Sequence, residues 1–140
     1  MVLPTIDSVS VLEQILSEQP LTAEYVDRFV IENLVSVKFC NLPSAGSVSV
    51  FSERHTWYHE TPWSWNSAIK FLILINPKYG FEESCVTFVH ETIHALYAHY
   101  EIRAFRAGVK RDEIERLIEE EAKRFYERNK SFVEKIVRRY

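Results

Sequence analysis

The segment from residue 81 to about residue 105 constrains the fold most, because its apolar residues recur with the period of an α-helix. The apolar side chains that share one face of this helix are Val86, Val89, Ile93, Leu96, Tyr97 and Tyr100. A helix with such a stripe has to bury it against other elements. Gly108 lies just beyond the segment and is typical of a helix end. We therefore expect a helix over residues 81–106 that forms part of the core.

The same segment carries two histidines, His90 and His94, within the sequence FVHETIHALY. Residues four apart on a helix differ by only about 40° around its axis, so both imidazoles can bind one metal ion. Glu91 lies about 100° from His90, where its carboxylate can take a proton from a zinc-activated water. We predict that His90 and His94 bind Zn²⁺ and that Glu91 is the catalytic base. The alternative is a core helix that carries two histidines by coincidence.

A catalytic zinc site needs a third protein ligand, and the sequence offers several. His99 is excluded because it lies on the opposite face of the helix from His90. His55 and His59 are not excluded by their spacing. A last helix, beginning near residue 111, carries Glu115 and Glu119 together along one edge of its apolar stripe. A carboxylate at that edge could reach an ion held by the neighbouring helix.

The rest of the chain predicts helices followed by strands within a single domain. The expected parts are N-terminal helices over 1–34, a sheet and an aromatic-rich loop over 35–80, the histidine helix over 81–106, and a last helix over 110–140. Strand-like runs at 34–39 and 47–52, separated by turn residues, predict a hairpin, and FLILI belongs to a strand over 69–75. The prediction is an α+β fold with a small, mostly antiparallel sheet.

Composition and charge narrow the function classes. The chain is 46% hydrophobic and 26% charged, which is typical of a globular domain. Its longest apolar run is too short for a membrane span, and its start lacks the pattern of a signal peptide, so we expect a cytoplasmic protein without a membrane partner. The last forty residues alternate basic and acidic side chains, which favours a solvated helix over a nucleic-acid interface. Abundant Glu, Lys and Arg with a single Met would suit a thermophile.

The motif HETIH, followed by EEEAKRF, resembles the gluzincin metallopeptidases, which carry HExxH on one helix and a glutamate ligand on the next. The second motif is similar to the E-x-E-A pattern of the membrane CAAX-type and heat-shock endopeptidases and of the small peptidases that cleave phage-type repressors. The chain most resembles the minigluzincins, minimal soluble zincins of thermophilic prokaryotes. This resemblance implies a minimal zincin-like fold and a zinc endopeptidase that acts on peptide or protein substrates. It also implies that Glu119, three residues before Ala122, is the third ligand.

The chain departs from those families at Lys123, where they have Asp or Asn four residues after the ligand. Glu115 is therefore the second choice of ligand, because Glu119 would then supply the acidic partner four residues later. The resemblance also implies latency, so we expect residues 127–140 to cover part of the cleft or to pack on a second copy of the chain as a homodimer. The alternative is a helix that completes the core.

Two further expectations concern the substrate. The strand at 69–75, if it lies at the sheet edge, could hold an extended peptide by strand addition. Tyr97, Tyr100 and Tyr126 are candidates for stabilising the oxyanion. The competing function class is a regulatory or binding protein with a structural, non-catalytic zinc site closed by a fourth ligand.

Overall fold

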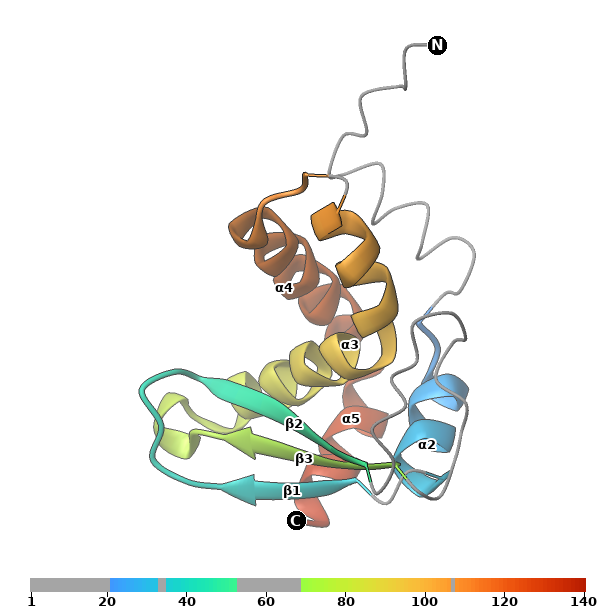
Figure 1. Cartoon of the computed structure of the whole chain (residues 1–140). Helices are drawn as coiled ribbons and strands as arrows, with labels where there is room; N and C mark the ends of the chain where they lie inside the picture. Colours follow the sequence, from blue (N-terminus) through green and yellow to red (C-terminus); the bar gives the residue numbers. More distant parts are fainter. Residues whose placement is uncertain (1–20, 33–34, 53–68, 107) are drawn as a thin grey trace, which may run out of the picture.

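The computed structural model describes residues 21–32, 35–52, 69–106 and 108–140. Their elements are α2 (Ala23–Glu32), β1 (Ser36–Phe39), β2 (Gly46–Ser52), β3 (Ile69–Ile75), the 3₁₀ turn η1 (Pro77–Tyr79), α3 (Phe81–Arg106), α4 (Arg111–Arg128) and α5 (Lys130–Arg138). This is a small α+β fold, as predicted (Figure 1). Residues 1–20, part of the segment expected to form N-terminal helices, and residues 53–68, part of the expected sheet and aromatic-rich loop, lie outside the described residues.

The three strands form a mixed sheet in the order β1-β3-β2. β1 pairs with β3 in parallel, from Ser36 opposite Leu72 onward, and β2 pairs with β3 antiparallel. The predicted hairpin between β1 and β2 is therefore wrong, and the sheet, predicted to be mostly antiparallel, is mixed. Residues 40–45 instead pass around the end of β3, where Asn76 donates its side-chain amide to the Leu42 carbonyl at 2.9 Å. A turn-rich connection of this length can cross a third strand as readily as it can close a hairpin.

The centre of the sheet is β3, so the edge position on which strand addition at residues 69–75 depended is not met. Phe71, Ile73 and Ile75 are fully buried on one face, and Leu72 and Leu74 are half-buried on the other. A near-continuous apolar run is typical of a strand that is covered on both faces of the sheet. Among the described strands, β2 forms the sheet edge that contacts α3.

Helices cover the face of the sheet that carries the buried β3 residues. Thr22 caps α2 by accepting a hydrogen bond from the Tyr25 amide at 3.1 Å. Phe29 of α2 packs edge-on against Phe71, with ring centroids 4.9 Å apart. Figure 1 shows α3 crossing the sheet and then turning away to run beside α4. The turn is at Tyr97, whose φ of −113° and ψ of 17° are not helical.

The predicted last helix is divided in two at Asn129, where φ is −134°. The second part, α5, lies in the core: Val133, Ile136 and Val137 are each at most 2% exposed. Tyr140, which follows α5, donates its hydroxyl to the carbonyl of Val35, the residue before β1, at 3.1 Å. This segment thus packs into the core; latency and packing on a second copy of the chain stay predictions. In the described part of the chain, no helix combines the length and apolar character needed to cross a bilayer.

Candidate metal centre

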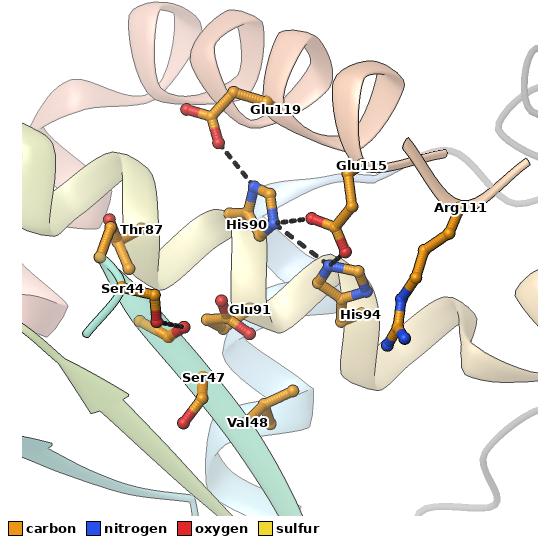
Figure 2. A pocket seen from close by; sticks show the side chains of 12 residues that line it. Ser44, Ser47, Val48, Thr87, His90, Glu91, His94, Arg111, Glu115 and Glu119 are labelled. Carbon is orange, nitrogen blue, oxygen red and sulfur yellow. Dashed lines mark hydrogen bonds and ion pairs between the residues drawn. The ribbon is translucent and has the colours of Figure 1, made fainter. Parts of the chain in front are cut away.

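Two imidazoles on α3 converge on one point. The Nε2 atoms of His90 and His94 lie 3.1 Å apart, and the rings are tilted by 54°. Both side chains are mostly buried, at 13% and 18% exposure, because the flanking residues of α3 pack into the core. Figure 2 shows both rings pointing away from the sheet toward α4. The predicted histidine pair is therefore brought together by one helical turn.

The third group at this point is Glu115 of α4. Its carboxylate oxygens lie 3.0 Å from His90 Nε2 and 2.9 Å from His94 Nε2. Burial of Ile114 and Ile118 packs α4 against α3 and fixes Glu115 at the edge of the apolar stripe. The three side chains form a group that could hold a metal ion. Around a tetrahedral zinc with bonds of about 2.0–2.1 Å, ligand atoms would lie roughly 3.3 Å apart, close to these separations.

Glu119, the third ligand favoured by the sequence resemblance, occupies a different position. Its Oε2 accepts a hydrogen bond of 2.6 Å from Nδ1 of His90, the nitrogen on the far side of the ring (Figure 2). The group that could hold a metal ion contains Glu115, the second choice of ligand from the sequence, in its place. A carboxylate on the far nitrogen of a histidine fixes the tautomer and aims the other nitrogen at an ion.

His94 has an equivalent partner. Its Nδ1 donates a hydrogen bond of 2.8 Å to Oε1 of Glu101, which lies two turns further along α3. Each Nε2 thus faces Glu115, and each Nδ1 faces another carboxylate. The local sequence pattern does not mark Glu101 as a partner of His94. A carboxylate seven residues after a histidine lies on the same side of a helix, but on a straight helix it is about 10.5 Å away.

The carboxylates set the charge of the histidines. Burial lowers the pKa of both imidazoles, but the hydrogen bonds to Glu115 and Glu119 outweigh it and raise the pKa of His90 to about 9. Glu101 and Glu115 raise the pKa of His94 to about 10 in the same way. Hydrogen bonds from the histidines lower the pKa of Glu115 and Glu119. The metal-free site therefore holds protons at neutral pH that a bound metal would displace.

Glu91 lies beside the histidines on the side that faces β2. The residue is 7% exposed, and burial raises its pKa above the ordinary value for glutamate. It lines a pocket of about 440 Å³ together with His90, His94, Glu115, Glu119 and residues 44–48. Figure 2 shows this pocket open between α3, α4 and the start of β2. No residue from 127–140 is among those that line it.

Gly46 allows β2 to approach Glu91 closely. A Cβ at this position would lie 2.4 Å from Thr87 Cγ2, 2.8 Å from the Leu74 carbonyl oxygen and 3.5 Å from Glu91 Cγ. Real Cβ atoms do not make contacts below 3.0 Å, and a backbone oxygen cannot move aside without disturbing the strand pairing.

Gly46→Ala is therefore expected to lower the free energy of unfolding by about 1–3 kcal/mol. Chemical denaturation of the metal-free protein measures this effect. Ala45→Ser, at the exposed neighbouring residue, serves as the control and should change stability by less than about 0.5 kcal/mol. Equal stability of Gly46→Ala and the wild type would show that the strand does not lie this close to α3.

Arg111 is the cationic side chain in the pocket lining, and the sequence analysis did not single it out. In the described ranges it makes no ion pair, whereas Arg116, Arg124 and Arg128 of the same helix are each bonded to glutamates. Tyr97 and Tyr126 do not line the pocket, and the side chain of Tyr100 lies outside the described residues. His55 and His59 lie outside them too.

Comparison of the chain with protein families, curated proteins and solved structures gives no match.

Proposed function

We propose that this protein is a zinc-dependent endopeptidase whose metal ligands are His90, His94 and Glu115. The observation that carries the proposal is the convergence of His90 Nε2, His94 Nε2 and the Glu115 carboxylate at separations of 2.9–3.1 Å. Two imidazoles and a carboxylate form the donor set of catalytic zinc sites, which keep a fourth position for water or substrate. Zinc bound there would polarise the scissile carbonyl and acidify a water molecule.

Glu91 has the position and environment of a general base and acid. It lines the pocket without belonging to the ligand group, and burial raises its pKa. It takes a proton from the attacking water and delivers it to the leaving amine. A raised pKa favours the second step, in which Glu91 acts as an acid. The alternative function, a regulatory or binding protein with a structural zinc site, has no role for this carboxylate.

The position of the third ligand agrees with the gluzincin resemblance in one respect. With Glu115 as the ligand, Glu119 follows four residues later and holds the Nδ1 of His90. Glu119 then supplies the acidic residue that the motif expects four positions after the ligand, where Lys123 would stand if Glu119 were the ligand. Glu115 therefore accounts for both acidic positions of the motif, whereas Glu119 as the ligand accounts for only one.

β2 provides a place for an extended peptide. In the part of the chain that the structure describes it lies at an edge of the sheet, and Ser47 and Val48 line the pocket beside Glu91 (Figure 2). Main-chain groups along such an edge can pair with a peptide, which would run past the metal ligands. Strand addition, expected at 69–75 from the sequence, is assigned here to β2. The substrate class is a peptide, or an unfolded segment of a protein, in extended conformation.

We assign the stabilisation of negative charge on the carbonyl oxygen to Arg111. Arg111→Ala is expected to lower kcat by about 10²-fold, the effect of removing one donor from an oxyanion site, without changing zinc affinity. Lys110→Ala, which removes the adjacent exposed cation outside the pocket, is the control. Steady-state hydrolysis of a quenched fluorescent peptide measures both variants. Equal activity of the two would exclude Arg111 from the reaction.

The proposal is tested by assaying the zinc-loaded protein against an unstructured protein substrate, with product peptides identified by mass spectrometry. We expect internal cleavages that disappear on chelation and return when zinc is restored. A zinc-loaded, folded protein that cleaves neither the protein nor a peptide library would contradict the proposal.

A further inference from the structure

The bend in α3 has a consequence for His94. Residues seven apart on a straight helix lie on the same side but are separated by about 10.5 Å along its axis. His94 and Glu101 are seven apart, yet their side chains form a hydrogen bond of 2.8 Å. The non-helical residue Tyr97 lies between them, and the helix turns there (Figure 1). The hydrogen bond between His94 and Glu101 thus spans the residue at which α3 departs from helical geometry.

Nothing in the sequence of α3 forces this bend. Sharp helix bends usually occur at proline or glycine, and the segment Phe81–Arg106 contains neither. Tyr97 itself is 1% exposed, and the part of α3 beyond it packs against α4. Tertiary packing therefore holds the bend, and the same packing places Glu115 over the histidines.

Glu101 differs from the other carboxylates at the site in its burial. Its side chain is 11% exposed, against 43% for Glu115 and 38% for Glu119. Burying an ionised carboxylate is unfavourable unless it is paired and hydrogen-bonded. The partner here is His94 Nδ1, the nitrogen that faces away from the metal-binding group. Such an arrangement fixes the imidazole in the form whose Nε2 can bind a metal.

We propose that Glu101 is a positioning residue of the metal site, which orients His94 through Nδ1 and depends on the bend at Tyr97 to reach it. This inference rests on the metal centre of the proposed function but not on peptide hydrolysis. With Glu119 on His90, it gives each histidine its own carboxylate, one from each of the two helices that form the site.

The first test is zinc affinity, measured by competition with a chromophoric chelator in the absence of any peptide. Glu101→Ala is expected to weaken zinc binding by about 10–100-fold, as observed for partners of metal-bound histidines. Glu101→Gln, whose amide oxygen still accepts a hydrogen bond, should retain most of the affinity. Glu83→Ala, an exposed residue in the first turn of α3, is the control and should match the wild type. Wild-type affinity in Glu101→Ala would overturn the proposal.

The second test separates positioning from a merely structural role. In zinc-loaded protein labelled with ¹⁵N-histidine, His94 should bind zinc through Nε2 and show a protected Nδ1–H resonance. Glu101→Gln should keep this resonance, and Glu101→Ala should lose it. Binding of wild-type His94 through Nδ1 would overturn the proposal, even if Glu101→Ala failed to fold. Absence of peptidase activity would contradict the proposed function alone, because neither test uses a substrate.

Discussion

Glu91→Gln is expected to lower the rate of zinc-dependent peptide hydrolysis by about 10²–10⁴-fold, which is the range for a positioned general acid or base. The substitution preserves the size of a side chain that is 7% exposed, so the fold should be retained. It removes the only function assigned to this group, the transfer of a proton. Zinc affinity should stay close to that of the wild type, because Glu91 is not in the metal-binding group.

The measurement is kcat/KM on a quenched fluorescent peptide, with bound zinc determined on the same samples. Glu83→Gln on the first turn of α3 is the matched control and should leave hydrolysis unchanged. Undiminished hydrolysis by a zinc-loaded Glu91→Gln variant would falsify the assigned mechanism. Loss of zinc along with activity would instead identify Glu91 as a ligand.

Glu115→Ala is expected to weaken zinc binding more than Glu119→Ala does. The carboxylate of Glu115 faces both Nε2 atoms, so its removal takes away a ligand, and the effect should exceed about 100-fold. Glu119 contacts only Nδ1 of His90, so its removal should cost about 10–100-fold. Glu120→Ala, on the exposed side of the same helix, should have no effect.

Competition titration with a chromophoric chelator provides the ranking of these three variants. The reverse order, with zinc lost from Glu119→Ala and retained by Glu115→Ala, would restore the ligand that the sequence resemblance favours. Equal and small effects would mean that α4 does not supply a ligand.

The histidine helix is predictable because the residues of this one segment determine both its helical form and its buried face. Val86, Val89 and Ile93 fix which face of α3 is buried, and the spacing of His90 and His94 follows from helical geometry alone. The sequence of α4 alone does not decide whether Glu115 or Glu119 is the third ligand. Both lie on the same edge of α4, one turn apart, and the packing of α4 on α3 decides which of them reaches the histidines.

The sheet order and the bend in α3 were not predictable from local pattern. The turn residues between β1 and β2 are compatible with a hairpin, but the crossing of β3 between the two strands depends on contacts with residues 69–75. Tyr97 gives no sign of a bend, because tertiary packing rather than proline or glycine produces it. The sequence around Glu101 is therefore that of a solvated helix face, whereas in the structure its side chain is mostly buried and bonded to His94.

The central claim is that His90, His94 and Glu115 hold zinc, and an anomalous-difference map at the zinc edge from a zinc-supplemented crystal tests it most directly. The predicted result is one peak bonded to His90 Nε2, His94 Nε2 and a Glu115 carboxylate oxygen, with its fourth position open toward β2. No peak between the histidines, or a peak enclosed by four protein ligands, would contradict the catalytic centre described here.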